Sequence, residues 1–141
     1  MLNMRQTIWV LVAIFSVNLV GLYLEWYNFF WFDMVLHFSG GLFVAMLFAN
    51  YLKAHALPNA KLANILIVVG AATMIGVVWE FAEYFAHITF AEKASAAFGM
   101  RVDFMGDLDD TITDLLMDML GALLAAKLSL RFLSRVNKGR S

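Results

Sequence analysis

Four long apolar runs set the strongest limit on what this chain can fold into. Each holds about twenty mostly hydrophobic residues, the length that an α-helix needs to cross a bilayer. The runs cover about residues 6–24, 33–52, 62–85 and 110–130. Over the 141 residues, 62% are hydrophobic and 15% are charged, against about 45–50% and about 25% in soluble domains. The sequence therefore predicts an all-α polytopic membrane protein, a four-transmembrane-helix bundle forming one integral membrane domain over residues 1–141.

Composition also excludes several classes of function. The net charge is −1 and there is no broad basic region, so nucleic acid is not an expected partner. Cysteine is absent, which excludes disulfides, thiol nucleophiles and cysteine-based metal sites. The G-x-S-x-G, H-E-x-x-H and P-loop patterns are absent too. The lipid bilayer is the partner that composition predicts, and no oligomeric state follows from it.

The positions of lysine and arginine predict the orientation of the chain. Basic residues near the ends of spans favour the cytoplasmic side. They gather before the first run, between the second and third, and after the fourth: Arg5, Lys53, Lys61, Arg131, Arg135, Lys138 and Arg140. We therefore expect both termini in the cytoplasm. The aromatic stretch 26–32 and the long connection 87–109, in which residues 90–98 are expected to form a short surface helix, then face outward.

With this orientation, ionisable residues from all four runs gather at one depth near the outer side. They are Glu25, Asp33, His37, Glu80, Glu83, His87, Asp110, Asp114 and Asp118. A charge at mid-bilayer costs from about 2.5 to well over 10 kcal/mol, depending on method, so acids there usually serve a function. Steps of three and four residues place these groups on one face of each helix, above small residues. The pattern predicts a bundle packed through small residues, with an acidic outer cavity.

Several carboxylates at this depth need protons or cations between them. Divalent cations such as calcium and magnesium prefer oxygen ligands, and a histidine would also admit zinc, manganese or iron. The leading hypothesis is a divalent metal site, with His37 as a nitrogen ligand or orienting base. The expected oxygen ligands are Glu80, Glu83, Asp114 and Asp118. Asp33 and Asp110 are further candidates, although helix capping competes for both. Glu25 and Asp107 are expected in solvated loops.

Three other functions fit the same residues. An enzyme acting on a lipid or an envelope precursor would use them to hold a metal or to transfer protons. A proton or ion transporter would titrate them in turn. A structural or regulatory membrane subunit would use them only to hold helices together. The residues alone do not choose among these functions, and they name no substrate or lipid-like ligand.

Short motifs at these positions resemble a known family. They are D-x-x-x-H-F-x-x-G from Asp33, W-E-x-x-E from Trp79, and D-D-T-x-x-D-x-x-x-D-x-x-G-A from Asp109. Over about residues 30–125 the chain resembles the YjdF-like small membrane proteins and, more distantly, the VanZ-like proteins. The resemblance implies a bacterial inner-membrane protein with the same acidic groups, and it supplies no activity. Asp118 departs from the VanZ-like pattern, so a glycopeptide-resistance role is not carried over.

Overall fold

The computed structural model describes residues 2–52, 57 and 60–138, with side chains up to residue 129. Within these residues the chain is helical and contains no strand. The elements are α1 (Met4–Tyr23), the 3-10 helix η1 (Trp26–Asn28), α2 (Phe30–Leu52), α3 (Lys61–Phe98) and α4 (Leu108–Lys138). The predicted all-α fold is confirmed. Of the basic residues used to predict orientation, Lys53 and Arg140 lie outside the described residues.

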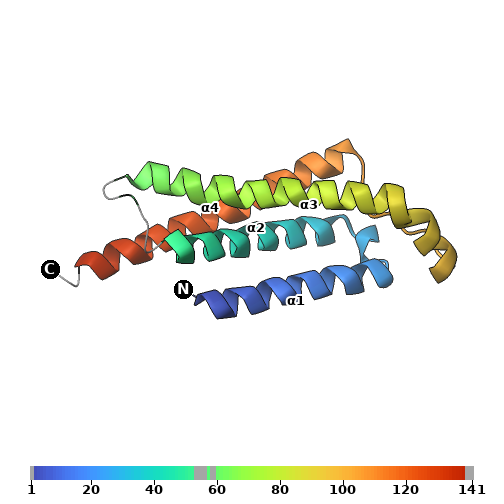
Figure 1. The fold of residues 1–141 in the computed structure, drawn as a ribbon, viewed down its shortest axis with the longest axis horizontal. Helices are drawn as coiled ribbons and strands as arrows, with labels where there is room; N and C mark the ends of the chain where they lie inside the picture. Colours follow the sequence, from blue (N-terminus) through green and yellow to red (C-terminus); the bar gives the residue numbers. More distant parts are fainter. Residues whose placement is uncertain (1, 53–56, 58–59, 139–141) are drawn as a thin grey trace.

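The helices run alongside one another in an elongated bundle (Figure 1). The start of α1, the end of α2, the start of α3 and the end of α4 all lie at one end of it. The 3-10 helix η1 and the α3–α4 connection lie at the other end. The parts of the chain predicted to face the cytoplasm therefore share one end of the bundle, and those predicted to face outward share the other.

Three helices, α1, α2 and α3, are long and apolar enough to cross a membrane. Their outer faces expose large apolar side chains, including Trp9, Leu66 and Phe81. The fourth helix is long enough but carries more charge in its apolar stretch. Two of those charges, Asp114 and Asp118, are buried inside the bundle. Because α4 hides these acids from its surroundings, they do not oppose a fourth span, which stays a prediction.

Helix α3 is longer than the predicted third span. It has 38 residues, about 57 Å at about 1.5 Å per residue, which exceeds the hydrocarbon core of about 30 Å. Residues 90–98 are helical as predicted, but they continue α3 instead of forming a separate helix. The helix ends at Gly99, whose φ of 67° is a left-handed conformation that suits glycine. The connection expected from residue 87 therefore begins only at Gly99.

The α2–α4 pair packs through small residues at its centre. A Cβ on Gly41 of α2 would overlap the backbone of Asp118, and a Cβ on Gly121 of α4 would overlap the Phe38 carbonyl. Further along, the buried core consists mainly of alanines from α2, α3 and α4. Small side chains let the backbones of membrane helices approach closely. The predicted packing through small residues is confirmed, and it fixes α2 against α4 at the depth of the acidic residues.

Candidate functional site

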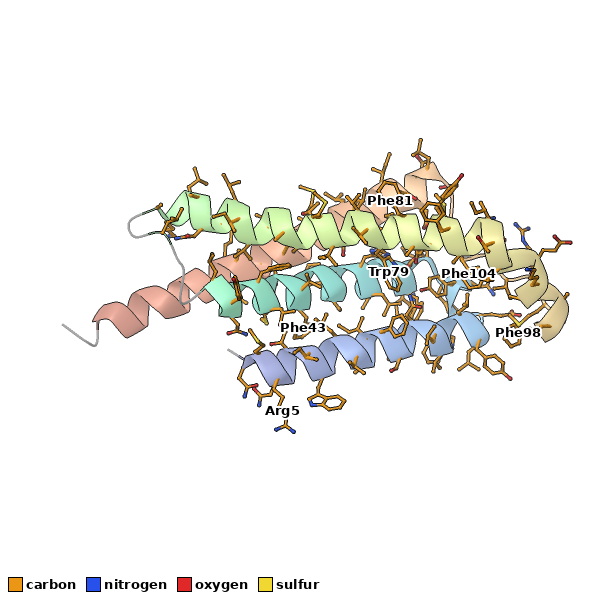
Figure 2. All side chains as sticks on the ribbon, viewed as in Figure 1. Arg5, Phe43, Trp79, Phe81, Phe98 and Phe104 are labelled. Atoms are coloured by element: carbon orange, nitrogen blue, oxygen red, sulfur yellow. The ribbon has the colours of Figure 1, made fainter. Side chains whose placement is uncertain are left out.

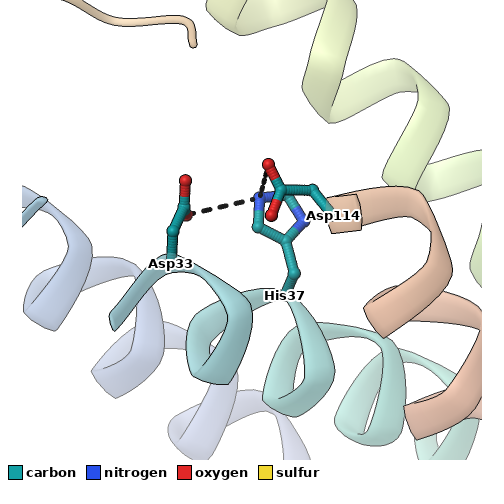
Figure 3. Close-up of side chains that lie close together, drawn as sticks. All are labelled: Asp33, His37 and Asp114. Atoms are coloured by element: carbon teal, nitrogen blue, oxygen red, sulfur yellow. Dashed lines mark ion pairs between the residues drawn. The ribbon is translucent and has the colours of Figure 1, made fainter. Parts of the chain in front are cut away.

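His37 of α2 lies at the centre of a cluster of carboxylates from α2, α3 and α4. Its Nε2 atom is 3.6 Å from Asp33 Oδ1, 3.9 Å from Glu80 Oε1 and 3.9 Å from Asp114 Oδ2. Figure 3 shows Asp33 and Asp114 on either side of the ring. The side chains of His37, Glu80 and Asp114 are less than 10% exposed, and that of Asp33 is 15% exposed. Three helices thus bring acids to one ring nitrogen, as the sequence predicts.

Local helix geometry explains why these groups meet. Asp33 and His37 are separated by one turn of α2, so their side chains share a face. Asp114 and Asp118 are likewise one turn apart on α4, and both lie within 4 Å of the His37 ring. The close α2–α4 approach places this pair of acids against the ring. Glu80 completes the cluster from the buried face of α3.

Asp118 contacts the other nitrogen of the ring. Its Oδ2 atom is 3.3 Å from His37 Nδ1. The Asp118 carboxylate also occupies the space beside Gly76 of α3, where any Cβ would overlap it. A carboxylate on Nδ1 favours the tautomer that carries the proton there, which leaves the Nε2 lone pair free. Asp118 therefore orients the ring toward Asp33, Glu80 and Asp114.

Two carboxylate oxygens in the cluster are buried without a hydrogen-bond partner, namely Asp33 Oδ1 and Glu80 Oε1. Leaving a buried polar group unpaired costs about 1–3 kcal/mol, and more for a charged group. Both atoms lie toward His37 Nε2, at distances too long for a hydrogen bond. The cluster therefore has unused ligand capacity at its centre.

Glu83 lies at the edge of the cluster, beside a cavity. Its Oε1 atom accepts a hydrogen bond from Trp79 Nε1 at 2.8 Å. The cavity has a volume of about 690 Å³, and Asp33, Glu83 and Asp110 are among the residues that line it. The predicted acidic cavity is therefore present in the bundle, at the end that holds η1 and the α3–α4 connection.

Two residues outside the predicted ligand set also line this cavity, Asn18 and Tyr27. Asn18 Nδ2 donates a hydrogen bond to Tyr27 Oη at 2.8 Å. Burial raises the pKa of the Tyr27 hydroxyl, and the negative charges of Asp33 and Glu83 raise it further. Tyr27 therefore stays protonated at neutral pH and can donate a hydrogen bond. A tyrosine in an aromatic interfacial stretch gave no signal that would separate it from its neighbours.

The structure also tests the capping and loop positions expected for the remaining acids. Asp107, expected in a solvated loop, accepts a hydrogen bond from the Asp110 backbone N–H at 3.0 Å and so caps α4. Capping by Asp110 is therefore wrong, because its own N–H is the donor. Asp33 lies inside the first turn of α2 and points at His37, so it does not cap that helix. Glu25 is exposed in the α1–η1 turn, as expected.

The described residues offer two overlapping sets of metal ligands that share His37. One is Asp33, His37 and Asp114, and the other is His37, Glu80 and Glu83. In each set the candidate ligand atoms lie within 4.8 Å of one another. Asp110 belongs to neither set. The predicted ligands thus have different positions. Most of them surround His37 Nε2, Asp118 contacts Nδ1, and Asp110 lines the cavity.

Comparison with known proteins places this arrangement in a family. A family model described as "Predicted membrane protein (DUF2238)" matches residues 2–135. The chain belongs to the DUF2238 family of predicted membrane proteins. It is also 29% identical over 126 residues to an uncharacterized protein of Thermotoga maritima, covering 84% of this chain and 58% of that relative. The chain thus spans little more than half of the relative's length. No solved structure matches it.

Proposed function

We propose that this membrane protein binds a divalent metal ion through His37 and the carboxylates around its Nε2 atom. The observation that carries the proposal is the spacing of these groups. Metal–ligand bonds of about 2.0–2.2 Å place neighbouring ligands of one ion about 2.8–3.6 Å apart. The oxygens of Asp33, Glu80 and Asp114 are 3.6–3.9 Å from Nε2. Movements of a few tenths of an ångström bring each oxygen to the expected distance from Nε2, and Asp33, His37 and Asp114 already form one ligand set. Glu80 belongs to the second set, with Glu83, and has to move further to share an ion with Asp33 and Asp114.

The partners of each atom support the same proposal. An ion among these oxygens satisfies Asp33 Oδ1 and Glu80 Oε1, which otherwise lack hydrogen bonds. Asp118 takes the role of an outer partner on Nδ1, as carboxylates commonly do for histidines that bind metals. We therefore propose His37, Asp33 and Asp114 as the ligands, Glu80 as a ligand that joins them when its side chain moves, and Asp118 as the orienting group. Glu83, which accepts a hydrogen bond from Trp79, is an additional candidate ligand.

The donor atoms also favour certain metals. One imidazole nitrogen among carboxylate oxygens suits manganese, iron or zinc, whereas magnesium and calcium prefer oxygen alone. We expect manganese and zinc to bind more tightly than magnesium or calcium. A divalent ion would tie α2, α3 and α4 together at the depth where their acids meet. The ion would also offset two of the buried negative charges.

The first experiment measures thermal unfolding of metal-depleted protein in detergent, with each divalent ion added in turn. An ion that binds only the folded state stabilises it by about 2.7 kcal/mol at a hundredfold excess over its Kd. We expect manganese or zinc to raise the midpoint. Protons compete for the same ligands, so the shift should shrink as pH falls. Elemental analysis of the purified protein measures the stoichiometry.

Matched variants separate this site from surface binding. Asp114→Asn keeps the shape of a buried ligand and should remove most of the metal-dependent shift. Asp109→Asn, a change of the same kind at an exposed position of α4, should leave the shift intact. His87→Ala controls for adventitious zinc binding by a second histidine. If no divalent ion raises the midpoint and no metal co-purifies, His37 and the acids share protons instead, and the metal proposal fails.

We further propose that the protein is a YjdF-like protein of the bacterial inner membrane, with α4 as a fourth span and both termini in the cytoplasm. The two ends of the bundle carry exposed positions suited to a test, Asn28 in η1 and Lys61 at the start of α3. Because the chain has no cysteine, single cysteines at these positions report without background. The Asn28→Cys protein should react with an impermeant thiol reagent in intact cells. Reaction of Lys61→Cys under the same conditions would reverse the proposed orientation.

A further inference from the structure

Two hollows meet on the side of the bundle between α1 and α3. One is an apolar slot of about 150 Å³, lined by side chains such as Leu11 and Ile75. The other is the acidic cavity of about 690 Å³. Phe15, Asn18 and Trp79 line both of them. A molecule can therefore have an apolar part in the slot and a polar part in the cavity at the same time.

The slot is not sealed from the surroundings of the bundle. Among the described residues, α1 packs on α2 and η1, and its backbone does not closely approach α3. One bridge between α1 and α3 is the edge-to-face contact of Phe15 with Trp79, at 6.0 Å between ring centroids. Phe15 and Ile75, which line the slot, are 49% and 44% exposed. In a helix bundle within a bilayer, such an opening faces hydrocarbon chains.

The chemistry of the two hollows differs. The slot is mainly apolar, with Asn18, His37 and Asp118 as the polar residues of its lining. A cavity with mainly apolar walls accepts apolar guests. The described lining of the cavity carries five carboxylates and no lysine, arginine or histidine. Arg101 pairs with one of them, Asp103, at 2.6 Å. The rings of Tyr27 and Trp79 also line this cavity, and aromatic faces attract cations.

We propose that the two hollows bind one membrane lipid with a positively charged amine headgroup, which enters sideways between α1 and α3. Part of one acyl chain lies in the slot, and the ammonium group lies among the acids of the cavity. The occupant is a lipid because the slot is apolar and opens on the side of membrane-spanning helices. The headgroup is an amine because the cavity lining is acidic and aromatic. This inference goes beyond the metal site and does not require the metal to be bound.

The test uses Trp79, which lies where the two hollows meet. A variant with Trp9, Trp26 and Trp31 changed to phenylalanine leaves Trp79 as the single tryptophan. The protein is placed in nanodiscs of mixed phosphatidylethanolamine and phosphatidylglycerol, with brominated acyl chains on one lipid at a time. Bromine quenches tryptophan fluorescence on contact. We expect several-fold stronger quenching when the phosphatidylethanolamine is brominated. Equal quenching by both lipids, or stronger quenching by phosphatidylglycerol, would overturn the proposed headgroup.

Two variants test the two hollows separately. Gly40 lines the slot, and a Cβ there meets only Asp118 Oδ1 at 3.8 Å, so Gly40→Leu fills the slot. Its matched control is Gly70→Leu, at a glycine with open space around it. Gly40→Leu should strongly reduce the quenching of Trp79 by either lipid, and Gly70→Leu should not. Asp110→Asn should reduce the preference for phosphatidylethanolamine while quenching persists.

The folding of each variant is checked by circular dichroism and by its elution as a single species. Unchanged quenching in folded Gly40→Leu would show that the slot holds no acyl chain. If Gly40→Leu does not fold, Leu11→Phe narrows the slot from α1 and gives the same readout. The metal-dependent thermal shift is measured on the same samples. In the single-tryptophan protein without further substitutions, absence of a lipid preference together with an intact metal shift would refute only the lipid proposal. A lipid preference without a metal shift would refute only the metal site.

Discussion

The α2–α4 pair and helix α1 show two ways in which apolar helices associate. Between α2 and α4, Gly41 and Gly121 bring the backbones together, and the cluster around His37 lies beside this approach. Helix α1 buries only Thr7 and Gly21, and Phe32 of α2 covers Gly21. Most of its large side chains, including Trp9, remain exposed. The close pair holds polar groups in fixed positions, whereas the outer helix leaves room for hollows beside it.

The difference arises from what each helix must bury. Buried acids are tolerated in a bilayer only where neighbouring helices supply partners, so α2, α3 and α4 must pack closely around them. Helix α1 carries no buried acid, and lipid solvates its apolar side chains as well as protein does. Close packing is therefore confined to the part of the bundle that contains the ionisable residues.

The largest expected effect tests the close approach itself. Gly41→Ala introduces a Cβ that overlaps the Asp118 backbone, so we expect it to destabilise the protein by about 1–3 kcal/mol. Gly70→Ala, on the open face of α3, should be neutral or stabilising by up to about 1 kcal/mol, because alanine favours helix. Thermal or denaturant unfolding in detergent measures both. Equal effects would mean that α2 and α4 are not in close contact.

The second prediction, with an effect of intermediate size, tests whether α2, α3 and α4 contribute to one site. Glu80 on α3 and Asp114 on α4 both lie 3.9 Å from His37 Nε2. The effects of Glu80→Gln and Asp114→Asn on unfolding should therefore be non-additive, with a coupling free energy above about 0.5 kcal/mol. A cycle of Asp114→Asn with Trp9→Phe, on the outer face of α1, serves as the control. Additivity in both cycles would separate Glu80 from the site.

The smallest effect concerns the contact of α1 with α3. Phe15→Ala removes the edge-to-face contact with Trp79, which we expect to cost about 0.5–1.5 kcal/mol. Phe81→Ala is the matched control, since Phe81 lies on the outer side of α3 (Figure 2). The two midpoints are compared in the same detergent. A loss as large as that of Gly41→Ala would contradict the view of α1 as the loosely packed helix.

Periodicity predicted much of this architecture because each helix has to place its few polar residues on one face. The repeat of a single helix is enough to predict that Asp33, His37 and Gly41 lie on one face. The sequence does not give the rotation of one helix against another, and that rotation puts Asp118 on Nδ1 instead of among the oxygens around Nε2. It also leaves Asp110 at the cavity wall. Such differences of one helical turn depend on tertiary packing.

Helix boundaries were predicted less well where no breaker marks them. The third span was predicted to end at residue 85, but the residues that follow, including charged Glu92 and Lys93, do not oppose helix, so α3 continues to Gly99. The capping role of Asp107 was missed for a similar reason. Three aspartates, Asp107, Asp109 and Asp110, lie near the start of α4, and the sequence does not tell which of them caps it. The hydrogen bond from the Asp110 backbone N–H shows that Asp107 is the cap.

Asp118 is held by glycine on two sides, since its backbone lies against Gly41 and its carboxylate fills the space beside Gly76. This arrangement restricts the order in which the sequence can change. A larger residue at position 76 forces the Asp118 carboxylate to move, whereas a shorter side chain at position 118 would make room for it. If residue 76 were enlarged first, its side chain and the Asp118 carboxylate would compete for the same space. Substitutions at these positions are therefore epistatic, although residue 76 contributes no functional group of its own.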